Sequence, residues 1–221
     1  MTTETEPAFQ PHLDVLPSAQ RRVWGGLAGA TAGFVLYGGT AIALQLGHRE
    51  SVDFDFFSRQ AFDVGDIPKR AAMLSGADVV ERAPGTLTLG VEGVKVSFFH
   101  TPDLRAVQAP RISSDTRVHV ASLLDLAATK LDVVQKRAEA KDYLDIDHLI
   151  RFGVDLPTAL AAASAAFGPA FVPLASLKAL TYFGDGNLQS LKEDVRGRLI
   201  TAVSSVDLGN LPVVKTWDGE E

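Results

Sequence analysis

The sequence predicts an α+β fold, in which residues 1–120 form a mixed sheet with flanking helices and residues 121–221 form a helical domain. Short apolar runs between residues 34 and 99 are separated by glycine turns or by helical segments, as is typical of an α/β domain. After residue 120 the apolar residues recur with helical spacing only. The chain has no internal repeat, so one α/β domain packed against one helical domain is expected.

The first domain begins with a helix, for which Ser18 is the expected cap. A short apolar strand at 34–37 leads through Gly38 and Gly39 into a short helix that Gly47 closes. The segment 52–56 alternates with period two and is therefore expected to be a strand. The remaining elements expected here are a helix at 67–74 and strands at 78–82, 86–91 and 94–99.

The second domain is expected to contain helices only. Residues 121–137 carry an apolar stripe that repeats every 3.6 residues, formed by Leu124, Ala127, Ala128, Leu131 and Val134. Further helices are expected at 142–151, 158–167, 174–183 and 191–206.

The composition excludes several classes of protein. Of the 221 residues, 46% are hydrophobic and 22% charged, as in an ordinary globular protein. The chain has no cysteine, which excludes disulfides, a thiolate nucleophile and cysteine-ligated metal centres, and favours a reducing, cytoplasmic compartment. The net charge of −6 means that a polyanion such as RNA has to bind a local basic patch.

Membrane and zinc-enzyme classes also find no support. Two long uncharged stretches, 23–47 and 156–177, are interrupted by glycine or proline, so both are expected to be buried segments broken by turns. The acidic N-terminal segment lacks the pattern of a signal peptide. The five histidines show no zinc-binding spacing, and neither a serine-hydrolase elbow nor a Walker A motif is present.

The segment at residues 38–57, GGTAIALQLGHRESVDFDFF, contains the residues expected to bind phosphate and a metal ion. Gly38 and Gly39 let the backbone approach a phosphate closely, and the helix that begins at Thr40 directs free N–H groups at the same anion. Asp53 and Asp55 are two residues apart on the next strand, so their carboxylates share one face. Two such oxygen donors suit Mg²⁺ together with substrate phosphates, although either motif alone is commonly structural.

This segment, together with LLDLAATKLDVVQKRAEAKDYLDIDHLI, resembles the AbiEii/AbiGii-type nucleotidyltransferase toxins of the DNA polymerase β-like superfamily. The resemblance covers about residues 34 to 150. It implies a nucleotidyltransferase-like first domain with Gly38 and Gly39 in the phosphate turn and Asp53 and Asp55 as metal ligands. It also matches Lys130, Lys141, Asp142 and Asp145 to the family's lysine helix and Lys-Asp-x-x-Asp helix.

The cations near these motifs allow two interpretations. Lys130 and Arg137 are seven residues apart, hence on one face of a helix, where they contact the triphosphate and the nucleotide or acceptor, or simply flank a core stripe. Lys141 and Asp145 are either site residues or a helix surface pair. Arg49 precedes the metal strand and either meets phosphate or is solvated.

Two departures from the superfamily pattern stand out. The usual Gly-Ser of the phosphate turn is Gly-Gly here, with Thr40 as the nearest hydroxyl. The third carboxylate of the superfamily, on a later strand, is missing, because that strand offers Lys95 and Ser97. Three alternatives follow: Asp142 replaces the missing base, with Asp145 as fallback, or the site holds one metal, or the enzyme is inactive.

The expected function is transfer of NMP from an NTP to an acceptor hydroxyl, with Mg²⁺ or Mn²⁺ as cofactor and pyrophosphate as the second product. The resemblance implies an RNA acceptor, such as a tRNA 3′ end, or a protein acceptor, and a cognate antitoxin. The alternatives are transfer to a small molecule such as an antibiotic, and an inactive nucleotide-binding module.

Overall fold

The computed structural model describes residues 8–217, so the extreme ends of both predicted domains and part of the N-terminal segment interpreted above lie outside the described residues. The chain divides into two compact units. The first runs up to Leu104 and includes Ala109–Ser122, and the second comprises Arg105–Gln108 and the chain from Leu123 onward. The short segment joins the helical unit because the Asp125 carboxylate accepts hydrogen bonds from the N–H groups of Val107 (2.7 Å) and Gln108 (3.3 Å).

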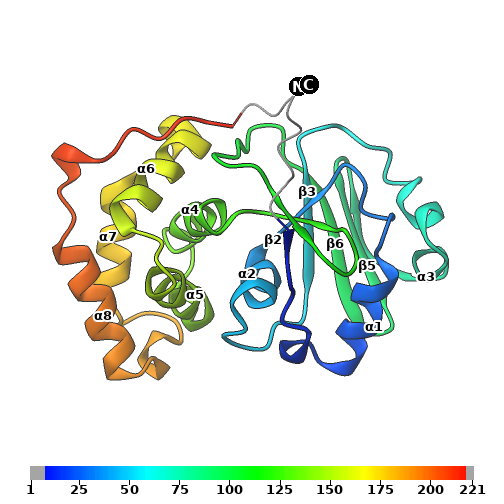
Figure 1. Cartoon of the computed structure of the whole chain (residues 1–221), viewed down its shortest axis with the longest axis horizontal. Helices are drawn as coiled ribbons and strands as arrows, with labels where there is room; N and C mark the ends of the chain where they lie inside the picture. The colour runs from blue at the N-terminus through cyan, green and yellow to red at the C-terminus, as the bar shows by residue number, and fades with distance from the viewer. Residues whose placement is uncertain (1–7, 218–221) are drawn as a thin grey trace. The chain divides into compact units, whose positions relative to one another are not determined.

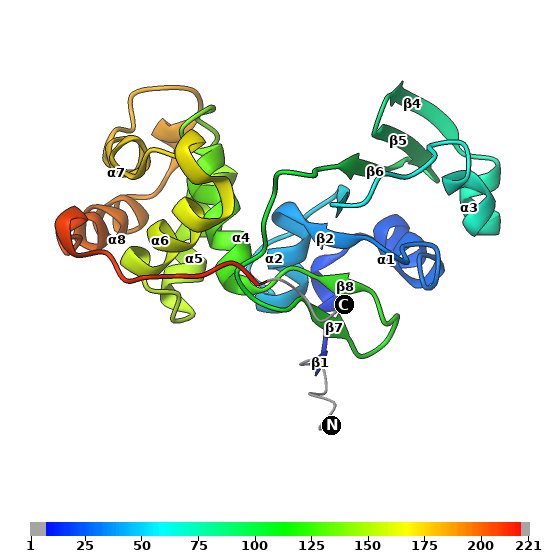
Figure 2. The same ribbon diagram turned by 90° about the horizontal axis from the view of Figure 1, so that it is seen from above.

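The first unit is built on an eight-stranded mixed sheet (Figures 1 and 2). Its strand order is β1-β7-β8-β2-β3-β6-β5-β4. The β2–β3 pair is antiparallel and the β3–β6 pair parallel. The strands are β1 (Ala8–Phe9), β2 (Val35–Tyr37), β3 (Phe54–Ser58), β4 (Asp78–Ala83), β5 (Thr86–Val91), β6 (Val94–His100), β7 (Arg111–Ser113) and β8 (His119–Val120).

Strand β3 divides its side chains between two environments. Phe54 and Phe56 are fully buried, and their rings stack on Trp24 of α1 (Ser18–Gly26) and on Phe98 of β6. Asp55 points to the opposite face and is only half-buried. Core packing therefore fixes the register of β3, and this register fixes where the carboxylate lies.

Helix α2 (Gly38–Leu46) follows β2 without a linking residue. Gly47 ends it in the left-handed conformation (φ +63°), as the sequence predicts. The predicted helix at 67–74 is instead the short 3-10 helix η2 (Ile67–Arg70) and the single turn α3 (Ala72–Ser75), and η1 (Leu13–Val15) precedes α1.

The second unit contains helices only within the described residues, which confirms the predicted fold class together with the mixed sheet (Figure 1). Asp155 caps α6 by accepting hydrogen bonds from the Thr158 N–H (3.1 Å) and hydroxyl (2.9 Å). The elements are α4 (Leu123–Val133), α5 (Ala140–Arg151), α6 (Leu156–Phe167), α7 (Pro173–Thr181), α8 (Glu193–Ser204), η3 (Gly168–Ala170), η4 (Leu188–Ser190) and η5 (Leu208–Asn210).

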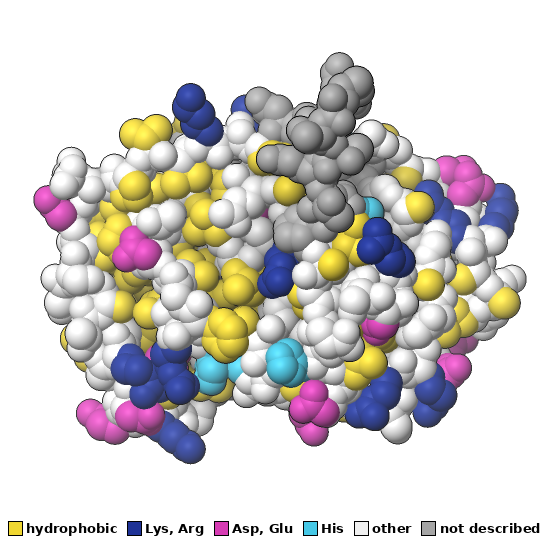
Figure 3. Space-filling model, in the orientation of Figure 1, with side chains coloured by type: hydrophobic (Ala, Val, Ile, Leu, Met, Phe, Trp, Pro, Cys, Tyr) yellow, Lys and Arg dark blue, Asp and Glu magenta, His cyan; other side chains and the backbone are white. Residues whose placement is uncertain are grey.

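Among the described helices, none is by itself long and apolar enough to cross a membrane. The segments Ala140–Arg151 and Leu156–Ala170 reach the required length and composition only together, with a bend of 118° between them. In the helical unit several large apolar side chains are exposed, and Figure 3 shows hydrophobic side chains gathered on one face of this unit.

Candidate active site

The turn from β2 into α2 brings glycine backbone against a carboxylate. Gly38 has a φ of +77°, a left-handed conformation that favours glycine. A Cβ atom on Gly38 would lie 3.0 Å from Oδ2 of Asp55, which β2–β3 pairing places opposite Tyr37. The N-terminal N–H groups of α2 and the Asp55 carboxylate therefore lie at the same end of the β2–β3 pair.

Arg49 and Ser51 complete this turn from the loop that precedes β3. A side chain on Gly39 would collide with the guanidinium of Arg49, so this cation lies directly over the glycine turn. Thr40 is buried, and its hydroxyl bonds to Ser51 Oγ (2.8 Å) and to the carbonyl of Asp53. Thr40 thus anchors the loop that carries Arg49 and Asp53, a different task from the phosphate contact that the sequence suggested.

The strand expected at 52–56 is observed as β3 (Phe54–Ser58), so half-buried Asp55 lies on it, whereas Asp53 is exposed and lies in the loop just before it. A third carboxylate does not accompany them: the parallel β6 places Ser97 in register with Asp55, and Ser97 is buried and bonded to the Thr88 hydroxyl (3.3 Å). The described residues contain no cluster of three or more acidic or histidine ligands.

These residues nevertheless fit a divalent cation that is also held by phosphates. Mg²⁺ takes one or two carboxylates and completes its coordination with water and phosphate oxygens. Because Gly38 has no Cβ, the Asp55 carboxylate lies close against the backbone of the turn.

The predicted residues of the helical unit form a buried ion-pair cluster. Lys130 on α4 pairs with Asp142 (2.6 Å) and Asp145 (2.7 Å) on α5, and both carboxylates are fully buried. Arg137 donates to Asp142 through Nε (2.8 Å) and Nη2 (3.1 Å). Lys130 is itself 5% exposed, so its ammonium lies between the Asp142 and Asp145 carboxylates and not in solvent.

The cluster also changes the expected roles of its neighbours. Arg137 does not share a helix with Lys130, because α4 ends at Val133; the turn to α5 brings both cations to Asp142. Lys141 pairs with Glu139 (2.9 Å), so the suggested Lys141–Asp145 surface pair does not form.

Asp142 is poorly suited to the base role suggested for it. Burial alone would raise the pKa of Asp142, but hydrogen bonds from Arg137 and the charge of Lys130 outweigh it, and the pKa lies below the ordinary 3.8. A general base near neutral pH needs a higher proton affinity. The geometry fits a positioning role, in which Asp142 and Asp145 fix Lys130 and Arg137.

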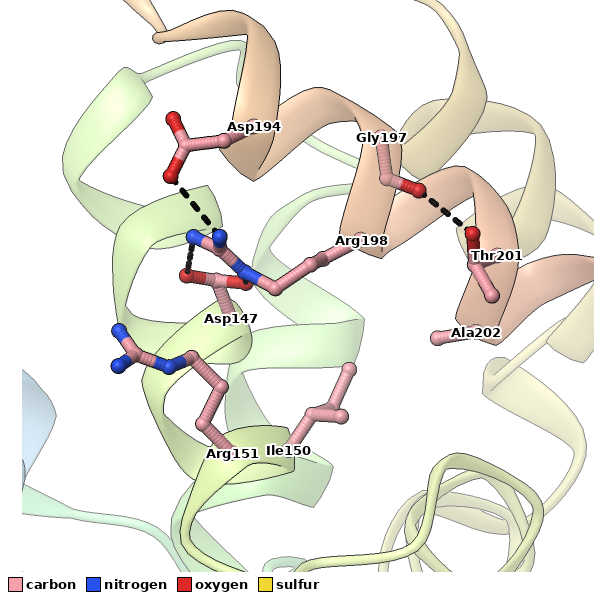
Figure 4. A pocket seen from close by; sticks show the side chains of 8 residues that line it. All are labelled: Asp147, Ile150, Arg151, Asp194, Gly197, Arg198, Thr201 and Ala202. Carbon is pink, nitrogen blue, oxygen red and sulfur yellow. Dashed lines mark hydrogen bonds and ion pairs between the residues drawn. The ribbon is translucent and has the colours of Figure 1, made fainter.

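Among the described residues of the helical unit, two hollows have volumes of about 280 and 590 Å³, and sequence reasoning found neither. The smaller one includes Lys136, Arg137 and Tyr182 in its lining. The larger one lies between α5 and α8 (Figure 4). In it Arg198 forms two hydrogen bonds with buried Asp147, both of 2.7 Å, and a third with Asp194 (2.9 Å), and its lining residues include no aromatic ring.

Comparison with known proteins places the chain in a family. The family described as "Nucleotidyl transferase AbiEii toxin, Type IV TA system" matches residues 26–195. The uncharacterized protein aq_aa25 of Aquifex aeolicus (strain VF5) is 32% identical over 120 residues, which are 53% of this chain and 58% of that protein. The match thus spans less than two thirds of that relative's length.

Solved structures add a similarity of fold. MenT4, the nucleotidyltransferase toxin Rv2826c from Mycobacterium tuberculosis H37Rv, superimposes with a TM-score of 0.58 at 14% identity, covering 85% of this chain and 84% of that one. The Megavirus polyadenylate synthase gives a TM-score of 0.42 at 14% identity over 61% of this chain and 32% of its own. From the match over residues 26–195, the chain belongs to the nucleotidyl transferase AbiEii toxin family of type IV toxin–antitoxin systems.

Proposed function

We propose that this chain is a metal-dependent nucleotidyltransferase, which transfers NMP from an NTP to an acceptor hydroxyl and releases pyrophosphate. The proposal rests on three groups that lie together at one turn. These are the Gly38 backbone, the Asp55 carboxylate beside it and the Arg49 guanidinium over Gly39. Membership of a nucleotidyltransferase family supports it.

Different residues at this turn bind the phosphates and the metal ion. The N–H groups at the start of α2 bind the outer phosphates of the NTP, and Arg49 adds a cation over the same turn. Asp53 and Asp55 hold a divalent ion, Mg²⁺ or Mn²⁺, which when bound offsets negative charge on the transferring and leaving phosphates. Thr40 keeps the loop that carries Asp53 in place by bonding to its carbonyl group.

The acceptor we propose is an RNA, in particular the 3′ end of a tRNA, and the location is the cytoplasm, where NTP and tRNA are both available. A cognate antitoxin belongs to the same proposal, because the family is one of toxin–antitoxin systems. Arg137 and Lys141 supply positive charge in the helical unit for nucleotide or acceptor. Asp142 positions Arg137, and Lys130, buried between Asp142 and Asp145, holds both carboxylates in place.

The test is transfer from each of the four labelled NTPs, with Mg²⁺, to total RNA and to purified tRNA. Asp55→Asn keeps the shape of the side chain but removes its charge, and Asp53→Ala removes an exposed carboxylate. Each variant is expected to lower transfer by about 10²–10³-fold, the scale for losing one preorganised electrostatic group. Thermal unfolding should stay close to wild type, because neither change creates a core cavity.

Asp78→Asn is the matched control, because Asp78 is an exposed carboxylate at the start of β4 in the same sheet. This variant should transfer at the wild-type rate. Wild-type transfer by Asp55→Asn would overturn the metal assignment, and NTP binding without any transfer by the wild-type chain would identify an inactive nucleotide-binding module.

A further inference from the structure

The smaller hollow of the helical unit lies where the end of α4, the α7 terminus and the loop before η4 come together. Its volume is about 280 Å³, close to the lower limit of the about 300–1,000 Å³ usual for small-molecule sites. It is therefore large enough for one small ring system and its substituent. Its lining residues are Val134, Gln135, Lys136, Arg137, Ala138, Tyr143, Ala179, Tyr182, Asp185 and Leu188.

The walls of this hollow are fixed by close contacts. The Ala140 N–H at the start of α5 donates to Asn187 Oδ1 (2.7 Å), and the Tyr143 hydroxyl donates to the Ala179 carbonyl (3.2 Å). Gly186 has a φ of +52°, and a side chain there would collide with the carbonyl of Ala138. The loop is thus seated tightly on the α4–α5 turn, and the hollow is preformed.

Its chemistry combines an exposed aromatic ring with cations. Tyr182 is 59% exposed, and its phenol end lies against Gly184, where a Cβ atom would be only 2.6 Å from Oη. The side chains of Lys136 and Arg137 are 69% and 46% exposed, and each also pairs with a carboxylate, Lys136 with Asp132 (2.5 Å) and Arg137 with Asp142 (2.8 Å). Exposed aromatic rings beside Lys or Arg are the elements with which proteins bind single nucleotides, by stacking on the base and pairing with the phosphate.

We propose that this hollow binds one nucleotide unit, with the base stacked on Tyr182 and the phosphate paired with Lys136 and Arg137. Asp185 at the same rim accepts a hydrogen bond from a ribose hydroxyl or an exocyclic amino group. The inference deepens the proposed nucleotidyl transfer and rests on it for its role, because the nucleotide unit comes either from the donor NTP or from the 3′ end of an RNA acceptor.

Arg137 connects this hollow with the buried cluster. Its guanidinium is held by Asp142, which also holds Lys130, so the cation at the rim has a fixed position before any ligand arrives. A preorganised cation loses less conformational entropy when it binds phosphate than a free surface arginine does. The larger hollow offers no aromatic ring among its lining residues.

The experiment measures the dissociation constants of the four NTPs and of a short single-stranded RNA with a free 3′ hydroxyl, by calorimetry in the full chain. Tyr182→Ala should weaken one of these ligands about 5- to 150-fold, which corresponds to the ~1–3 kcal/mol of one base–aromatic stack. Tyr182→Phe keeps the ring and should bind like wild type.

Phe152→Ala is the matched control, since Phe152 is 60% exposed on the helical unit and does not line the hollow. It should leave every dissociation constant unchanged. Lost NTP binding in Tyr182→Ala assigns the hollow to the donor, and lost RNA binding assigns it to the acceptor. Unchanged binding of both ligands, or an equal loss in Phe152→Ala, overturns the proposal.

All binding is measured without Mg²⁺ and repeated in Asp55→Asn, so that transfer is not needed for the result. If Asp55→Asn still transfers NMP, the proposed metal site fails while the Tyr182 result stands. If Tyr182→Ala binds both ligands normally while Asp55→Asn is inactive, the hollow fails and the proposed function stands.

Discussion

Asp142 is a single residue on which the stability of the helical unit is expected to depend. It is fully buried and accepts hydrogen bonds from Lys130 and Arg137, which lower its pKa below 3.8 despite burial. A carboxyl whose pKa is lower in the folded than in the unfolded chain stabilises the fold above the unfolded pKa. This stabilisation disappears as the pH falls through the folded value.

Asp142→Asn is therefore expected to lose about 1–3 kcal/mol of unfolding free energy at pH 7, because two cations lose a charged partner. The difference from wild type should shrink as the pH falls below about 4. Urea unfolding between pH 7 and pH 3 measures it. Asp66→Asn is the control, since the pKa of Asp66 is also lowered, by Lys69, but the pair is exposed and should contribute no measurable difference. A pH-independent difference for Asp142→Asn would contradict this account.

At the residue scale, the sequence allowed Gly38 and Asp55 to be paired because both belong to one local strand–turn–helix–strand unit. It gave no comparable signal for Ser51 or for the Ser97–Thr88 bond, because these contacts depend on loop closure and on strand register. Tyr182 was missed for a similar reason: a lone tyrosine after a helix marks a site only once the loop at 184–187 closes beside it.

The contact between α5 and α8 depends on one arginine. Arg198 of α8 reaches Asp147 of α5, whose side chain is 2% exposed, and Asp194 on its own helix (Figure 4). Arg198→Ala leaves the Asp147 carboxylate buried without this partner and is expected to cost about 1–3 kcal/mol of unfolding free energy. This cost is below the about 3–5 kcal/mol expected when one partner of a fully buried ion pair is removed outright, because Arg198 is 38% exposed and partly screened.

Asp194→Ala is the comparison for this element, since it removes only the exposed i,i+4 partner and leaves the Asp147 pair intact. Its unfolding free energy should stay close to wild type. Denaturant unfolding of both variants separates the two contributions, and an equal loss in both would mean that the helix surface pair, and not the link to α5, stabilises the unit.

Elements differ in how well periodicity can predict them. The antiparallel strands β4, β5 and β6 and the helices α5 to α8 were predicted within two residues of their observed bounds. Each is long enough for its hydrophobic residues to show the period of a strand or a helix. β1, β7 and β8 have only two or three residues each and were not predicted, since pairing with neighbours defines them. The break between α4 and α5 lies at residues 134–139, whereas the sequence predicted it at 138–141. It was predicted too late in the chain because the apolar stripe continues to Val134.

The charge of the whole molecule sets how strongly salt should affect RNA binding. With a net charge of −6, the protein repels RNA at long range, so the cations of the smaller hollow have to supply the attraction locally. Single-stranded nucleic acid gives a slope of log K against log salt of about −0.7 per phosphate neutralised. Because Lys136 and Arg137 are proposed to pair with one phosphate, the hollow predicts a slope of about −0.7.

Titrating the short RNA between about 50 and 200 mM salt measures this slope. Lys136→Ala should weaken RNA binding and bring the slope closer to zero, since the phosphate loses one of its two cations. Lys215→Ala, which removes an exposed lysine that does not line the hollow, should leave it unchanged. Added salt also screens the long-range repulsion between the negatively charged protein and the RNA. The measured slope can therefore be less negative, but not more negative, than the phosphate contacts in the hollow predict. A slope of about −4 or beyond would therefore mean that an extended basic surface, and not the two-cation hollow, holds the RNA.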